Sequence, residues 1–173
     1  MKINDLKLEH VYRIFQIYEK HAGIEMPDYV SPYDVYLELL DAKEDPSAGW
    51  DAADGYRVGS KFTGHSKLAF VIHDDGDLQL MFRPNLDRRY LHEAKLEPRA
   101  NATAERFSGE VKAYFDSVAN GKNNTPEDLQ AREYAEDDKK MFAKLKKSYL
   151  ENPTKGTEWQ QGQNKRIYGR EII

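Results

Sequence analysis

The chain has 173 residues, which is enough for one domain with a buried core. Hydrophobic residues make up 39% of it and charged residues 32%, so we expect a small core beneath a heavily charged surface. The absence of cysteine excludes disulfides, thiolate catalysis and cysteine-based zinc sites. No apolar run is long enough for a secretory leader or a membrane span, which leads us to expect a cytoplasmic protein without membrane partners.

Acidic and basic residues are separated along the chain. From Lys139 to Ile173 nine Lys and Arg stand against three Glu, which gives a net charge of +6. Because the whole chain carries −4, residues 1–138 carry −10. The sequence therefore predicts an acidic body that ends in a basic segment.

The N-terminal third predicts two helices. Apolar side chains recur at helical spacing over residues 5–22, and Gly23 would end this helix. The segment Ser31-Pro32-Tyr33-Asp34 combines a capping serine, a proline suited to the first helical position and an aspartate that closes a capping box. A second helix should follow to about residue 42. Several Gly and Pro residues then predict a long irregular loop over residues 44–59.

Two short apolar runs in the middle of the chain predict a β-hairpin. Leu68–His73 and Leu78–Phe82 are rich in strand-forming residues, and Asp75-Gly76 between them is typical of a two-residue hairpin turn. With a two-residue turn, Leu68, Phe70 and Ile72 would point to the opposite face from Leu78, Leu80 and Phe82. Both faces would then be mostly apolar, so neighbouring elements must cover them.

Two weaker patterns flank the hairpin. Residues 58–62 could add a third strand, because Gly64-His65-Ser66 indicates a turn before the hairpin. On the other side, a short helix over residues 86–95 is expected from scattered leucines in a charged stretch.

The C-terminal half predicts two longer helices and an arm. Helical spacing indicates one helix from about Thr103 to Asn120-Gly121, and Thr125-Pro126-Glu127-Asp128 is the cap signature of another. The second helix is polar at first and becomes apolar from Met141, so we expect its C-terminal half to dock on the body. Residues 154–170 are rich in Gly, Gln, Lys and Asn, which predicts an irregular arm.

Together these patterns predict an α+β fold. A small antiparallel sheet centred on the hairpin would be flanked by about four helices, with an irregular basic arm at the C-terminus. We expect residues 1–151 to form a single α+β domain and residues 152–173 to form the polar basic arm.

The patterns of catalytic and metal-binding residues are weak. The five histidines have no close metal-ligand spacing, and Gly59–Gly64 matches a phosphate-binding loop only loosely. His73, Asp75 and Asp77 bring an imidazole and carboxylates together at the turn, where a hard divalent cation could bind. Since Asp and Gly are also what a tight turn requires, we assign no metal, cofactor or catalytic residue. A small metal-dependent hydrolase or phosphotransferase at this turn remains an alternative.

The C-terminal segment carries the best candidate for a binding surface. Its basic and aromatic side chains are interleaved, and we predict partner contacts by Tyr149, Trp159, Lys165, Arg166, Tyr168 and Arg170. One hypothesis is a non-catalytic protein-binding module, such as an inhibitor, adaptor or assembly subunit, which uses this arm, an acidic aromatic surface, or both. The alternative is a nucleic-acid-binding accessory protein that uses Lys139–Arg170. We favour another protein as the partner, because the acidic body would repel a polyanion. The sequence leaves the oligomeric state open.

Overall fold

The computed structural model describes residues 1–22, 31–44, 50–52, 55–58, 68–73, 75–82 and 97–170. These ranges contain five α-helices: α1 (Leu8–Ala22), α2 (Pro32–Glu44), α4 (Glu97–Ala119), α5 (Pro126–Glu151) and α6 (Glu158–Tyr168). A short 3₁₀ turn (Ile3–Asp5) precedes α1. Four strands of three to five residues pair antiparallel in chain order: β1 (Trp50–Ala52), β2 (Gly55–Val58), β3 (Leu68–Ile72) and β4 (Leu78–Phe82).

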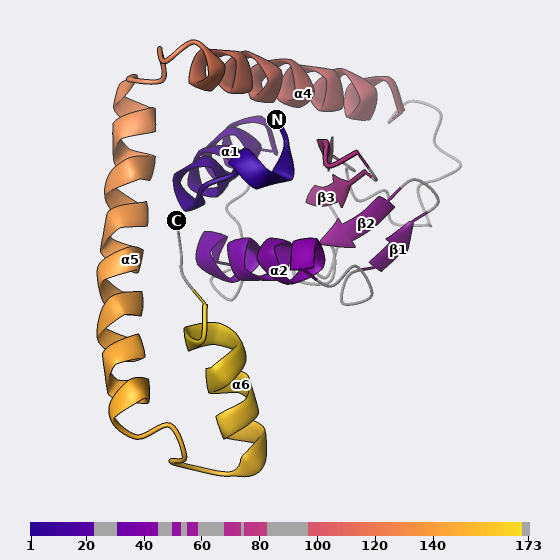
Figure 1. The fold of residues 1–173 in the computed structure, drawn as a ribbon. Coiled ribbons are helices and arrows are strands. Elements are labelled where there is room, and N and C mark those ends of the chain that lie inside the picture. The colour runs from indigo at the N-terminus through magenta and orange to yellow at the C-terminus, as the bar shows by residue number, and fades with distance from the viewer. Residues whose placement is uncertain are drawn as a thin grey trace.

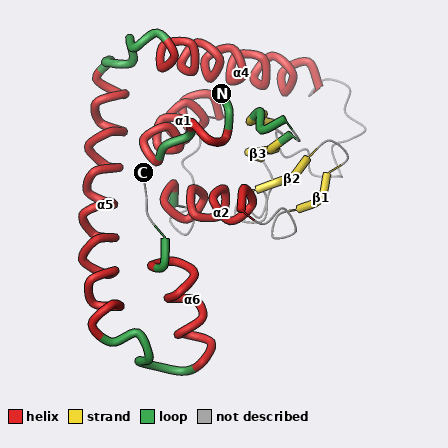
Figure 2. Tube along the Cα trace, in the orientation of Figure 1, coloured by secondary structure: helices red, strands yellow, loops and turns green. Residues whose placement is uncertain are grey.

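The described part of the chain is mostly helical, so the predicted α+β class, with a sheet at the centre of the fold, is wrong. Helix α4 crosses one end of the molecule and α5 runs down one side, while α1 and α2 lie inside this angle (Figures 1 and 2). The strands are short and lie at the far side from α5 (Figure 1). The strand-forming residues thus predicted the hairpin correctly, but the hairpin is a smaller part of the fold than the predicted α+β class requires.

Helix α1 is the centre of the core, as its predicted apolar periodicity implies. Leu8, Val11, Ile14 and Ile17 are fully buried, and α1 contacts α2, α4 and α5. On α4, Phe107 is also fully buried and packs edge-on against Tyr18. A helix surrounded on three sides needs apolar residues over much of its circumference, which explains its high content of buried residues.

The predicted hairpin is confirmed, but its predicted faces are wrong. In the observed register Phe70 lies opposite Leu80, and Ile72 lies opposite Leu78. Directly opposite residues point to the same side of a sheet, so the buried side chains of both strands share one face. Phe70, Ile72 and Leu78 are all buried in the core.

The turn explains this change of faces. His73 donates its backbone N–H to Asp77 and accepts from Gly76, and Gly76 has φ 86°. This is a three-residue loop that ends in a left-handed glycine, rather than the predicted two-residue turn. One extra residue shifts the pairing by one position, so the side chains of one strand point to the opposite face, relative to those of the other strand, from the predicted one. The N-terminus extends the pairing, since Ile3 donates to the Gly76 carbonyl.

We expect Gly76→Val to destabilise the fold by about 1–3 kcal/mol, because a β-branched residue resists positive φ. A steric clash would not cause this loss, since a Cβ at this position would lie 3.9 Å from the Ile3 side chain. Thermal and urea unfolding would measure the change. Gly109 in α4 is a matched control, because a Cβ there meets nothing within 4 Å. Gly109→Ala should stabilise the protein by about 0.5–1 kcal/mol. An unchanged Gly76→Val protein would contradict the strained turn.

Helix α5 docks mainly through its N-terminal half, and the predicted docking of its C-terminal half is confirmed only for Phe142, which is buried. Ala131 and Ala135 are buried against the body, whereas Met141 is 59% and Leu145 43% exposed. The small alanines let α5 approach α1 closely, so a half-helix with few large apolar residues still packs well. Asp128, also buried, pairs with Arg13 of α1 at 2.7 Å (Nε to Oδ1). The predicted cap at Thr125 is confirmed as a full capping box.

The irregular C-terminal arm is also a wrong prediction, because residues 158–168 form helix α6. Thr157 caps this helix by accepting from the Gln160 backbone N–H, while the Gln160 side chain accepts from the Thr157 N–H. The Gln161 side-chain amide donates to the carbonyls of Thr154 and Gly156, which ties the preceding turn together. The prediction of an irregular arm used the amino-acid composition of the segment and overlooked its capping signature, Thr157-Glu158-Trp159-Gln160.

The remaining predicted elements lie wholly, partly or not at all within the described residues. Both N-terminal helices are confirmed as α1 and α2, and the helix predicted from Thr103 begins earlier, at Glu97. The predicted irregular loop over residues 44–59 contains β1 and β2. The predicted third strand overlaps β2 only at Val58, and the rest of it lies outside the described residues, as does the short helix predicted over 86–95.

One buried histidine makes stability depend on pH. His10 is 3% exposed, and its Nδ1 accepts from the Lys7 backbone N–H at 2.9 Å, so the folded ring is held neutral. Burial lowers the pKa of His10 to about 4, below its ordinary value of 6.5. The unfolded chain therefore binds a proton between these values while the folded chain does not, so stability falls as pH falls from 6.5 towards 4.

Between pH 7 and pH 5 this histidine should remove about 2 kcal/mol of folding free energy. Chemical denaturation at the two pH values measures the loss. His10→Gln keeps an acceptor but no titratable group, so its stability should vary less over the same interval by that amount. Equal pH dependence in both proteins would contradict the assignment.

Candidate partner-binding site

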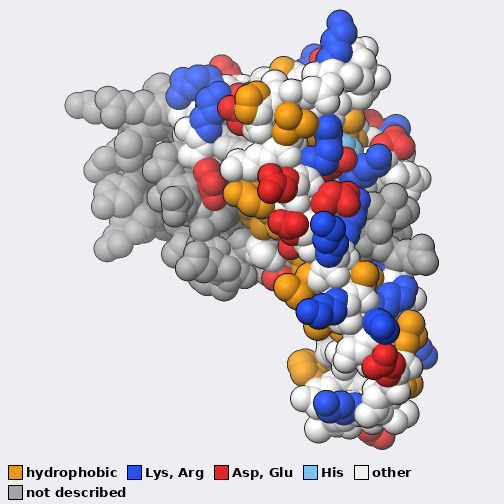
Figure 3. All heavy atoms as spheres, turned by 90° about the vertical axis from the view of Figure 1, so that its left-hand side faces the viewer, with side chains coloured by type: hydrophobic (Ala, Val, Ile, Leu, Met, Phe, Trp, Pro, Cys, Tyr) orange, Lys and Arg blue, Asp and Glu red, His pale blue; other side chains and the backbone are white. Residues whose placement is uncertain are grey.

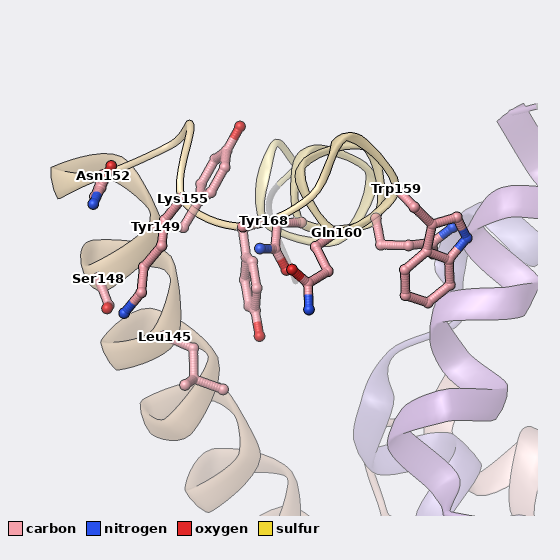
Figure 4. A pocket seen from close by; sticks show the side chains of 11 residues that line it. Leu145, Ser148, Tyr149, Asn152, Lys155, Trp159, Gln160 and Tyr168 are labelled. Carbon is pink, nitrogen blue, oxygen red and sulfur yellow. The ribbon is translucent and has the colours of Figure 1, made fainter.

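A cleft of about 420 Å³ opens between the C-terminal half of α5 and α6. We call residues 139–168 the projecting hairpin, because this pair of helices extends beyond the body (Figure 1). Apolar, aromatic and amide side chains line the cleft, with one lysine: Leu145, Ser148, Tyr149, Asn152, Lys155, Gly156, Trp159, Gln160, Gln163, Asn164 and Tyr168. The side chains come from both helices and from the turn between them (Figure 4).

Contacts between tilted aromatic rings hold α6 against α5. The Tyr168 ring lies 5.5 Å from that of Phe142 and 6.0 Å from that of Tyr149, measured between centroids. Phe142 is buried and reaches Tyr33 of α2 at 6.4 Å. Tilted ring pairs at these distances each stabilise a contact beyond the area they bury. Tyr168, which lines the cleft, therefore also holds together the two helices that form it.

An ionic clamp fixes the far end of α6 to the body. Asp41 of α2 accepts from Arg166 through one carboxylate oxygen and from Arg170 through the other. The Asp41 and Arg170 side chains are only 12% and 11% exposed, whereas Arg166 is half-exposed. Lys146 adds a hydrogen bond to the Arg170 carbonyl at 3.1 Å. Two arginines from the basic segment thus neutralise an acidic group of the body.

The six predicted contact residues divide into two sets. Tyr149, Trp159 and Tyr168 line the cleft, and Trp159 is 73% exposed. Arg166 and Arg170 are engaged within the chain by Asp41, and Lys165 is exposed outside the cleft lining. The structure thus places the three aromatic members in the lining of one cleft and engages both arginines in ion pairs with Asp41.

Several lysines of the projecting hairpin remain available. Among the described residues no ion-pair partner exists for Lys140, Lys144, Lys147, Lys155 or Lys165. Lys139, by contrast, pairs with Glu136 one turn earlier at 3.0 Å. The outer face of α5 therefore carries uncompensated positive charge towards its C-terminus.

The acidic turn at β3 and β4 is engaged in other contacts. Asp77 pairs with Lys2 at 2.8 Å, Asp75 accepts from the Asp77 backbone N–H, and His73 Nε2 lies 2.8 Å from the Gln79 side-chain oxygen. The backbone hydrogen bond from Asp77, more than the nearby Lys2, lowers the pKa of the Asp75 carboxyl. Within the described ranges no group of three or more potential metal ligands is found.

Sequence reasoning missed the cleft and the clamp. The lining residues Leu145, Gln163 and Asn164 belong to no motif, and Asp41 is one acidic residue among thirty. The available signal was the capping box at Thr157, which would have predicted α6 and hence a helical pair. Nothing in the sequence pairs Asp41 with arginines 125 and 129 positions away.

Comparison with models of protein families, with curated proteins and with solved structures found no match. Within the described residues, each helix is too short or too polar to cross a bilayer.

We expect Asp41→Asn to destabilise the protein by about 2–4 kcal/mol, because Arg170 would keep a largely buried charge without its partner. Hydrogen exchange should show the loss of protection concentrated in α6, and urea unfolding should give its size. Asp116→Asn is the control, since Asp116 is an exposed residue of α4 and should change stability little. Equal effects of the two substitutions would contradict a clamp at Asp41.

Proposed function

We propose that the chain is a non-catalytic protein-binding module whose contact surface is the cleft of the projecting hairpin. The observation that carries the proposal is the position of Trp159, a large aromatic side chain left 73% exposed beside an open cleft. Exposed Trp and Tyr beside a preformed concavity are typical of the residues that dominate protein interfaces. An inhibitor, an adaptor or an assembly subunit would each use such a surface.

The anchoring of the hairpin supports this proposal. Phe142 and Tyr168 hold the two helices together, and Asp41 fixes α6 to α2. A binding surface whose geometry is set before the partner arrives loses less conformational entropy on association. The cysteine-free composition agrees with a cytoplasmic setting for this activity.

A second candidate is nucleic-acid binding by the lysines of the hairpin. Lys140, Lys144 and Lys147 lie within about one face of α5 and have no ion-pair partner among the described residues. They could neutralise phosphates, and exposed Trp159 could stack on a base. Protein binding is preferred because Arg166 and Arg170 are already engaged by Asp41.

The first experiment is capture from a lysate of the source cells, with the whole chain as bait, with and without nuclease. The captured protein is then purified and titrated against the wild type and its variants. Trp159→Ala should weaken binding about tenfold or more, since it removes a central aromatic anchor, while Lys165→Ala should change it much less.

Salt dependence separates the two candidates. Affinity for random-sequence DNA or RNA that falls steeply with salt, together with capture abolished by nuclease, would contradict the protein-binding proposal and favour the lysine surface. In that case Lys144→Ala should reduce the salt slope by about one phosphate contact, and Trp159→Ala should leave that slope unchanged.

A further inference from the structure

Charge is segregated along α5 itself. Its N-terminal half, residues 126–138, contains six acidic residues and one arginine, whereas residues 139–151 contain five lysines and one glutamate. Acidic side chains gather at mid-height of the face that α5 presents, and basic ones lie lower on the projecting part (Figure 3). The helix dipole favours acid at the first turn and base at the last, but it does not extend to the middle of a 26-residue helix.

This segregation is unfavourable in a single chain. Glu133 and Asp137 are one turn apart, as are Lys140 and Lys144, and like charges at this spacing destabilise a helix. All four side chains are exposed, and none has an ion-pair partner among the described residues. An opposite charge from outside the chain would relieve both repulsions.

Apolar side chains on α5 run beside these charges. Tyr134 is 43%, Met141 59% and Leu145 43% exposed. Their spacing of seven and then four residues is that of the contact stripe in paired helices, so they form one stripe along α5. The stripe lies beside the docked face, which contains Ala131, Ala135 and Phe142.

We propose that two copies of the chain associate by antiparallel pairing of their α5 helices about a two-fold axis near Met141. This arrangement lays the acidic half of each helix along the basic half of the other. Tyr134 of one copy then lies beside Leu145 of the second, and the two Met141 side chains meet at the axis. Asp137 faces Lys144 twice, once on each side of the axis, because a two-fold interface repeats every contact.

The charges favour a second copy of the chain as the partner of this face, because α5 has an acidic half and a basic half that complement each other when two copies pair antiparallel. A parallel arrangement would place acid against acid and base against base. Three partly exposed apolar residues on each copy form a small core, so we expect a dimer that dissociates on dilution and weakens with salt. This interface shares Leu145 with the cleft, whereas Trp159, on which the proposed function depends, belongs to α6 and lies outside the stripe.

Sedimentation velocity over a wide range of protein concentration tests the pairing. The wild type should pass from monomer to dimer, and Asp137→Lys or Lys144→Glu alone should weaken the dimer about tenfold or more, because each change introduces two repulsive pairs. The double variant Asp137→Lys/Lys144→Glu should restore the wild-type dimer. Lys112→Glu on α4 is the control for a charge change elsewhere. Circular dichroism checks that every variant is folded.

A second measurement uses the absence of cysteine from the natural sequence. Met141→Cys should form a disulfide-linked dimer under mild oxidation, because the two sulfurs would lie near the axis, and Lys112→Cys should not. A monomer at every concentration, a dimer unaffected by either single reversal, or a double variant that fails to restore it would each overturn the proposal. Equal crosslinking at positions 141 and 112 would overturn it as well.

Discussion

The arrangement of the helices depends on one buried ion pair. Arg13 of α1 donates to Asp128 of α5, and the two side chains are only 12% and 4% exposed. Asp128 also completes the cap of α5 by accepting from the Thr125 backbone N–H, and Arg13 lies over the ring of Tyr114 in α4 at 5.4 Å. Burial alone would raise the pKa of Asp128, but hydrogen bonds from Arg13 and Thr125 outweigh it and lower that pKa. Contacts of these two side chains thus link α1, α4 and α5, and Asp128 also caps α5.

The consequences of this pair extend along α5. Since Asp128 fixes its first turn and Tyr12 donates to Asp138 near its middle, α5 is held over its N-terminal half. Beyond Phe142, which contacts Tyr33 of α2, the remaining turns of α5 leave the body and need other support. Asp41 and the aromatic rings supply it by returning α6 to the body, so the projecting hairpin is fixed at both ends. The proposed contact surfaces therefore rest on ordered elements rather than on an unstructured tail.

Local signals predicted local structure well. The cap at Thr125, the positive φ at Gly76 and the amphipathic pattern of α1 each act within a few residues, and each could be predicted from the sequence. The wrong predictions concern relations between distant segments. Small residues such as Ala131 can bury a helix face as well as large ones, so counting large apolar side chains missed the docked N-terminal half of α5. The cleft likewise depends on where α6 returns, which Asp41 determines from across the chain.

The contact between α1 and α5 also bears on the order in which the chain is made. Arg13 and Asp128 are separated by 115 positions, and Tyr12 and Asp138 by 126. During synthesis from the N-terminus, α1 emerges long before the helix that neutralises its buried charge. The apolar surface of α1 is fully covered only after α4 and α5 have been made, and α2 is the first of its neighbours to emerge. Contacts between such distant segments form slowly. Until they form, α1 exposes apolar surface, which is the condition in which nascent chains misassociate or bind chaperones.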